Sequence, residues 1–165
     1  MVVAQIRRAG EIKERTRFDQ AVTEMTVTIE NELEKYTTLL WATASLLTSA
    51  KGVDADEFRF FIERMQLAEK YPGIQGIGLS QRLLRERIPE FEAQMREYGY
   101  PDFKIWPVDD REEYHAILLL EPQDARNRAA LGYDMFSEPV RRQAMELARD
   151  TAAPAASGPV TLVQE

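Results

Sequence analysis

The stretch YHAILLLEP, residues 114–122, decides how this chain folds. Residues 114–120 are mostly apolar, and a short apolar run bounded by turn residues predicts a strand that is buried on both faces. Pro122 has no backbone N–H to give to a sheet, so the strand is expected to end just before it. We therefore predict that residues 114–120 form the central strand of a sheet.

Two further strands are predicted upstream of the central one. Residues 103–106 (FKIW) alternate apolar and polar side chains, as an edge strand does, and the charged residues 109–113 form the turn that follows. Residues 74–79 also read as a strand. Gly76 and Gly78 interrupt it, which indicates that another part of the backbone approaches closely there.

The remaining elements of this part of the chain are predicted to be helices and one last strand. Asp54 or Asp56 is placed to cap the first of these helices, while Ser137 and Pro139 mark the start of the last one. The expected helices cover residues 54–71, 88–98 and 137–152, and the last strand covers residues 160–163. This order predicts the α+β class, with a PAS-like, mainly antiparallel sheet flanked by helices.

The first 50 residues predict one long helix that ends near Gly52. Between Arg8 and Ala50 there is no proline, and the only glycine is Gly10. One stripe of this helix is apolar, with spacings of four, three and four residues: Phe18, Val22, Met25 and Ile29. A solitary helix cannot bury such a stripe against itself. We favour a stalk, residues 1–50, that forms a homodimer through this stripe and precedes a domain at residues 51–165; a core helix of one globule is the alternative.

Composition excludes several classes of function. The net charge of −7 argues against broad nucleic-acid binding, which needs a basic surface. The absence of cysteine rules out disulfides, zinc–thiolate sites and thiol nucleophiles. No apolar run reaches the roughly 20 residues of a membrane-spanning helix, and the first residues do not resemble a signal peptide. The chain is therefore either a cytosolic protein or a fragment of a longer one.

No group of residues predicts catalysis, a metal site or a cofactor. His115 is the only histidine, and it lies within the most strand-like run, so a structural role is favoured. The spacing of Gly73, Gly76 and Gly78 is not that of a dinucleotide-binding loop. The acidic residues at 109–113 are typical of a solvated turn.

Three arginines on the predicted helix 137–152 are the candidates for ligand binding: Arg141, Arg142 and Arg149. Exposure or pairing with a nearby acid is the simpler expectation for each of them. An arginine that turned inward toward an apolar cavity would instead bind an anion or a carboxylate.

Five stretches of the chain, in order, carry a resemblance: YPGIQGIGLSQRL (71–83), PDFKIWP (101–107), YHAILLLEP (114–122), ALGYDMFSEPVRRQAMELARDT (130–151) and GPVTLVQE (158–165). They resemble the CHASE domain, an extracytoplasmic sensor of histidine kinases and of nucleotide or diguanylate cyclases. RFDQAV, residues 17–22, is similar to the lead-in helix of that family. The similarity covers nearly the whole chain.

The resemblance implies a stalk helix, a distal PAS-like domain and a proximal PAS-like portion. The full-length receptor would be anchored in the inner membrane, with this part in the periplasm and a histidine kinase or diguanylate cyclase as its output. The sequence stops at Glu165. We therefore expect that one further strand, the proximal portion and the membrane spans lie outside it.

The resemblance also implies four ligand-binding residues. In the plant cytokinin receptors of this family, an aspartate on the helix after the GYDM-like segment holds the adenine ring, and Arg141 takes its place here. Because a guanidinium can only donate hydrogen bonds, the small-molecule ligand is expected to be anionic rather than a cytokinin. Met135, Val163 and Ser157 match three further positions at the ligand. A ligand-free module for dimerisation and signal relay is the alternative function.

Overall fold

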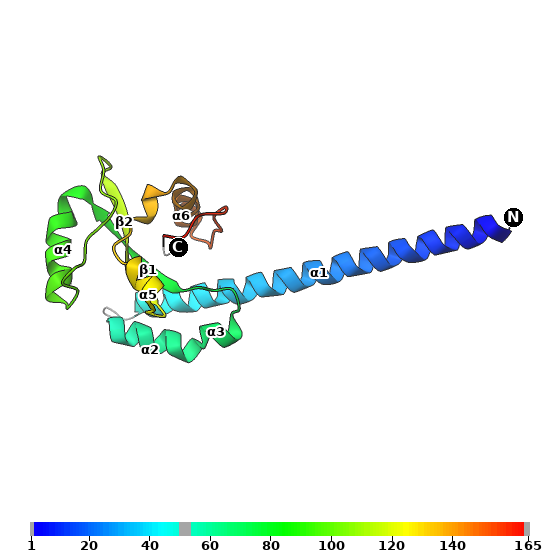
Figure 1. The fold of residues 1–165 in the computed structure, drawn as a ribbon, viewed down its shortest axis with the longest axis horizontal. Coiled ribbons are helices and arrows are strands. Elements are labelled where there is room, and N and C mark those ends of the chain that lie inside the picture. Colours follow the sequence, from blue (N-terminus) through cyan, green and yellow to red (C-terminus); the bar gives the residue numbers. More distant parts are fainter. Residues whose placement is uncertain (1, 50–53, 164–165) are drawn as a thin grey trace. The chain divides into compact units, whose positions relative to one another are not determined.

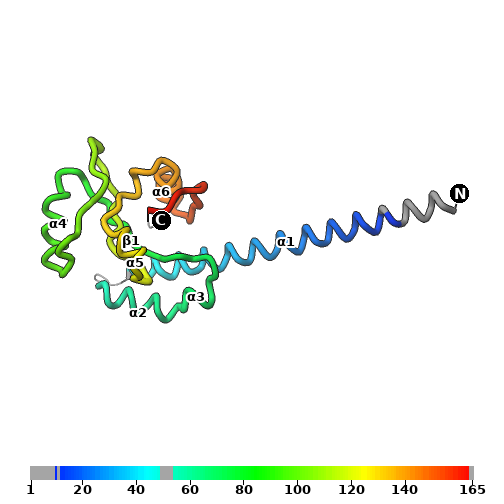
Figure 2. Tube along the Cα trace, in the orientation of Figure 1, coloured from blue at the N-terminus to red at the C-terminus, as the bar shows by residue number. Residues whose placement is uncertain are grey.

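The computed structural model describes residues 2–49 and 54–163, and the predicted helix end near Gly52 lies outside them. The chain forms two compact units, residues 1–50 and 51–165, which are described separately. The first unit consists of α1, Val2–Ser49, one continuous helix (Figure 1 and Figure 2). The predicted long helix is therefore confirmed.

The apolar stripe of α1 is exposed in the single chain. Phe18 and Met25 each expose 68% of their surface, and Val22 and Ile29 are also exposed. Several threonines of α1 turn their hydroxyl groups back to the carbonyl four residues earlier, as Thr23 does to Asp19 at 2.9 Å. This bond gives each of these hydroxyl groups a hydrogen-bond partner within the helix itself.

The second unit opens with α2, Ala55–Met65, which Asp54 caps as predicted. The Asp54 carboxylate accepts a hydrogen bond from the backbone N–H of Glu57 at 2.8 Å, and the Glu57 carboxylate accepts one from the N–H of Asp54 at 3.3 Å. This reciprocal pair satisfies two N–H groups that the helix start would otherwise leave unpaired. Gln66, with φ of 54°, then interrupts the predicted helix, and α3, Leu67–Lys70, completes it.

The sheet of the described residues consists of β1, Ile77–Leu84, and β2, Glu113–Glu121, paired antiparallel. The register joins Ile77 to Glu121 and Leu84 to Glu113, with an irregularity after Leu79. A Cβ atom on Gly78 would lie 2.3 Å from the carbonyl oxygen of Leu119. The predicted close approach of backbone at this glycine is therefore confirmed.

β2 is buried on both faces, as its composition predicts. Figure 1 shows α4, Ile88–Glu97, on one side of the sheet and α6, Pro139–Thr151, on the other. The α4 face contains a core of buried side chains from Leu83, Ile88, Met95, Phe103, Ile105, Tyr114 and Ala116. The other face contains the Tyr133 cluster, which we define as Ile117, Leu120, Ala130 and Tyr133.

Two predicted strands are absent from the described residues. Residues 103–106 form no strand, although Trp106 makes one isolated bridge to Tyr133. Their backbone takes another partner, because the N–H of Ile105 donates to the carboxylate of Glu92 at 2.9 Å. Residues 160–163 also form no strand, and the carbonyl of Thr161 accepts a hydrogen bond from the side chain of Arg141.

The start of α6 differs from the prediction by one residue. Glu138, not Ser137, is the cap, and its carboxylate accepts a hydrogen bond from the backbone N–H of Arg141 at 2.7 Å. The Ser137 hydroxyl donates instead to the carbonyl of Asp134 at 2.6 Å, which closes the short 3-10 turn Met135–Ser137. Between β2 and this turn lies α5, Ala125–Ala129.

Candidate ligand-binding site

The segment 131–137 runs beside β2 and is fixed there by backbone hydrogen bonds. The N–H of Gly132 donates to the carbonyl of Ile117 at 2.8 Å, and the N–H of Ile117 donates to the carbonyl of Tyr133 at 2.9 Å. On its other side, the N–H of Asp134 donates to the carbonyl of Trp106 at 2.7 Å. The direction in which Tyr133 and Met135 point is therefore set by two neighbouring segments.

Arg141 is the buried cation of α6. The residue is only 8% exposed, its Nη2 atom donates to the carbonyl of Thr161 at 3.1 Å, and its guanidinium lies 5.5 Å from the centre of the Tyr133 ring. Within residues 2–49 and 54–163, no carboxylate forms an ion pair with this guanidinium. Arg141 is therefore buried, and it is neither exposed nor paired with a nearby acid within the described residues.

Three of the four residues implied by the resemblance meet around Tyr133. Met135 and Val163, both half-buried, pack against the Tyr133 cluster, and Arg141 covers the ring of Tyr133 itself. Ser157 is exposed instead, and its hydroxyl donates to the carbonyl of the neighbouring Gly158 at 3.0 Å. The structure thus brings Met135 and Val163 to the Tyr133 cluster and places the Arg141 cation over the ring of one member of that cluster.

The other two arginines of α6 are exposed and paired. Arg142 bonds to Glu146 at 2.9 Å, and Arg149 bonds to Asp150 at 2.7 Å. Arg142 also lies 5.4 Å above the ring of Phe136. Their charges are balanced by neighbouring acids, so they lack the feature that singles out Arg141.

His115 has the structural role that the sequence favours. Its ring stacks on Phe136 with centroids 3.8 Å apart, and its Nε2 lies 2.9 Å from Glu113. Glu113 also accepts two hydrogen bonds from Arg82, each of 3.0 Å. Hydrogen bonds from Arg82 first, and then from His115, lower the pKa of Glu113 to about 2.

Two contributors to the site are missing from the sequence prediction. Asp134 is fully buried beside Tyr133, and Arg111 reaches it with Nη1 2.6 Å from Oδ2. An acid inside the otherwise apolar stretch 131–136 is the signal that could have identified Asp134. Arg111 is the single basic residue of the charged turn, but the sequence does not reveal its contact with Asp134, because the two lie 23 positions apart.

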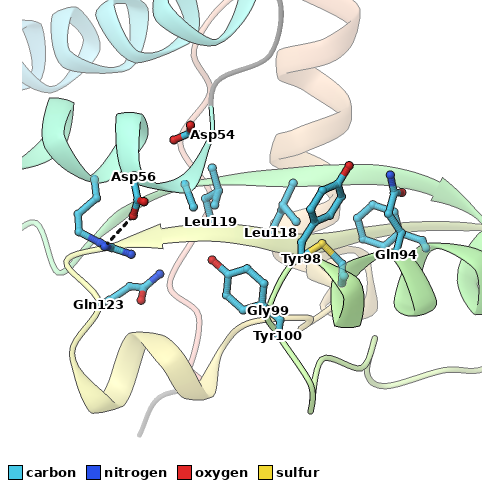
Figure 3. Close-up of a pocket in the computed structure, with 13 residues that line it drawn as sticks. Asp54, Asp56, Gln94, Tyr98, Gly99, Tyr100, Leu118, Leu119 and Gln123 are labelled. Carbon is cyan, nitrogen blue, oxygen red and sulfur yellow. Dashed lines mark hydrogen bonds and ion pairs between the residues drawn. The ribbon is translucent and has the colours of Figure 1, made fainter.

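A separate pocket of about 870 Å³ lies on the α4 face of the sheet. Figure 3 shows Asp54 and Asp56 on one side, Tyr98 and Tyr100 on the other, and Leu118 and Leu119 of β2 between them. Asp56 is paired with Arg59 of the same helix at 3.0 Å. None of the four residues implied by the resemblance lines this pocket.

Comparison with protein families gives a match to the CHASE domain over residues 51–165. The chain belongs to the CHASE domain family. CHASE domains are extracytoplasmic sensors of signalling receptors, and the match covers a sensory domain, not a catalytic one. No curated protein matches the chain. Within the described residues, no helix has the length and apolar character needed to cross a membrane.

Proposed function

We propose that this CHASE domain binds a small anionic molecule beside Arg141. The buried guanidinium carries the proposal: it lacks a carboxylate partner among the described residues and lies on the ring of Tyr133. Burial of an unpaired charge is costly, and a ligand that supplies the opposite charge offsets this cost. A carboxylate or phosphate also matches the planar set of donors that a guanidinium presents.

The remaining contacts of the ligand are apolar or neutral. Met135 and Val163, which pack against the same cluster, would enclose its uncharged part. Ser157 remains a proposed hydrogen-bonding contact from the exposed segment before Gly158. A site with one cation and mostly apolar surroundings suits a small organic acid better than a purine.

We further propose that the ligand state is passed on through the first unit. α1 would pair with α1 of a second copy through its exposed apolar stripe, and a change in helix packing would carry the signal. The full-length protein would be a membrane-anchored receptor with its sensor in the periplasm. Its output would be a histidine kinase or a diguanylate cyclase.

A thermal-shift experiment tests the anionic ligand directly. The purified chain is heated with acetate, pyruvate, succinate, inorganic phosphate or adenine, each at increasing concentration. An acid that binds the folded state alone is expected to raise the melting temperature, because saturation at about 100 times Kd adds roughly 2.7 kcal/mol to stability. Adenine is expected to cause no shift.

Matched variants assign the effect to the buried arginine. Arg141→Met is expected to abolish the shift, whereas Arg142→Met removes the same charge from the exposed neighbouring position and is expected to preserve it. A shift that survives in Arg141→Met, or that disappears equally in both variants, contradicts the proposed site.

One observation favours the ligand-free relay as a second candidate. The Arg141 guanidinium already has two partners inside the domain, the Thr161 carbonyl and the Tyr133 ring. If these contacts are sufficient, the site is filled by its own side chains. That candidate predicts that no compound of the panel shifts the melting temperature, and that Arg141→Met lowers the stability of the unliganded domain.

A further inference from the structure

Asp134 lies at the centre of the segment 131–137 and is inaccessible to solvent. It lies between Tyr133 and Met135, and its exposed fraction is 0%. Its Oδ1 atom accepts hydrogen bonds from the backbone N–H of His115 at 2.7 Å and from that of Phe136 at 3.1 Å. One carboxylate oxygen therefore ties the 3-10 turn that carries Met135 to β2.

The other oxygen of Asp134 faces Arg111. Nη1 of Arg111 lies 2.6 Å from Oδ2, and this is the one ion pair of Asp134 within the described ranges. Both Nη atoms of Arg111 and the Oδ2 atom of Asp134 are buried. The contact is a close ion pair, and Arg111 balances the charge of a carboxylate that is inaccessible to solvent.

The charged turn, residues 109–113, holds Arg111 in place. Both carboxylate oxygens of Asp109 accept hydrogen bonds from Nε of Arg111, each at 2.8 Å, and the guanidinium lies 5.0 Å from the Tyr114 ring centre. The buried hydroxyl of Tyr114 in turn donates to the carbonyl of Asp109 at 2.6 Å. The turn is therefore a preformed support for the guanidinium, and it is more than a solvated connection.

We propose that Arg111 is a positioning residue of the ligand site, which neutralises Asp134 and thereby lets the site accept an anion. This inference rests on the anionic ligand proposed above. In a medium of low dielectric, a carboxylate without its cation repels an anion that binds at the neighbouring residues Tyr133, Met135 and Arg141. Loss of Arg111 is also expected to loosen the turn that carries Met135, because the ionised Asp134 that holds the turn would lose the charge that stabilises it.

The experiment compares two arginines of the same region in the full chain. Arg111→Met removes the buried cation, and Arg85→Met removes an exposed one that pairs with Asp110 of the same turn at 3.2 Å. Binding of succinate and of inorganic phosphate is measured by calorimetry, and hydrogen exchange is measured across residues 133–137. We expect Arg111→Met to weaken the binding of a probe that the wild type binds by about fivefold or more. We expect faster exchange in Arg111→Met only, with Arg85→Met unchanged in both measurements.

A second pair of variants separates the effect of charge from a loss of folding. Asp134→Asn removes the buried charge, while its remaining carbonyl oxygen can still accept the two backbone hydrogen bonds. In that background, Arg111→Met is expected to change the affinity by less than about twofold, because there is no carboxylate left to neutralise. If Arg111→Met alone does not fold, the comparison of Asp134→Asn with the double variant still tests the role of Arg111.

Each outcome distinguishes the two proposals. Any of three results overturns the role of Arg111. These are wild-type affinity in Arg111→Met, an equal loss of affinity in Arg85→Met, and a fivefold loss of affinity when Arg111→Met is added to Asp134→Asn. If the wild type binds neither probe, the result counts against the anionic ligand itself. Exchange across residues 133–137 then decides the positioning role: faster exchange in Arg111→Met supports it, and unchanged exchange overturns it.

Discussion

Arg141 shows what a residue type alone reveals about a site and what it does not. The sequence identifies three arginines on one helix, and the resemblance selects Arg141 among them. Burial separates them physically, because Arg142 and Arg149 are exposed and paired with acids whereas Arg141 is enclosed. Whether an arginine turns inward depends on the segments that cover it, here residues 133 and 161, and a sequence pattern along one helix does not contain that information.

Glu113 gives a pH-dependent prediction at the residue scale. Its pKa in the folded state is about 2, below the usual 4.5, because Arg82 and His115 bond to the ionised carboxylate. A depressed pKa contributes stability that is fully present above 4.5 and is lost as the pH falls through about 2. Glu113→Gln is expected to cost on the order of 1 kcal/mol at pH 7, since the pair is partly exposed and solvent screens it.

Urea unfolding of the wild type and of Glu113→Gln at pH 7, 4 and about 2 measures this contribution. The difference in unfolding free energy between the two proteins is expected to shrink as the pH falls. Glu112→Gln serves as the control, because Glu112 is exposed at the adjacent position. A difference that stays constant down to the lowest pH contradicts the assigned cause.

At the scale of elements, the sequence predicts burial better than it predicts pairing. The apolar run of β2 and the close approach at Gly78 are both found in the structure. Residues 103–106 also bury Phe103 and Ile105, as their alternation indicates, yet they form no strand. A strand needs a neighbouring backbone in register, and here the carboxylate of Glu92 takes the N–H of Ile105. That partner lies on another element and leaves no trace in the pattern of residues 103–106.

The segment that carries Tyr133 depends on one glycine. Gly132 has φ of +78°, and a Cβ atom there would lie 1.9 Å from the carbonyl oxygen of Lys104. Gly132→Ala is therefore expected to lower the free energy of unfolding by about 3 kcal/mol or more, because strain and backbone overlap add up. It is also expected to abolish the thermal shift caused by an acid, since Tyr133 can no longer hold its place.

Gly99 provides the matched control for this substitution. Its φ of +95° is equally unusual for a residue with a side chain, but no atom lies within 4 Å of a Cβ built there. Gly99→Ala is expected to cost only about 1–2 kcal/mol, the price of a left-handed backbone. Chemical denaturation of both variants measures the two costs, and equal losses would show that the approach of Lys104 is unimportant.

At the scale of the whole molecule, the candidate site depends on segments that are far apart in the sequence. Arg141, Met135 and Val163 could be selected by resemblance, and the structure brings all three to the Tyr133 cluster. Asp134 and Arg111 could not be selected in the same way, because their importance arises from a contact between a turn and a distant segment. The fold class and the family are therefore accessible from sequence, whereas the ion pair between Arg111 and Asp134 is visible only in the three-dimensional structure.

The exposed stripe of α1 leads to the prediction that concerns two copies of the chain. Phe18, Val22, Met25 and Ile29 repeat with the spacing of a coiled-coil seam, and all four are exposed in the single chain. We expect the purified protein to sediment as a dimer. Met25→Glu is expected to convert it to a monomer, because like charges would meet on the buried seam of the paired helices.

Gln20→Glu adds the same charge on the opposite side of α1 and is expected to leave the dimer intact. Analytical ultracentrifugation over a range of concentrations decides between these outcomes. A wild-type monomer at every concentration, or equal dissociation in both variants, would mean that a second copy does not cover this stripe.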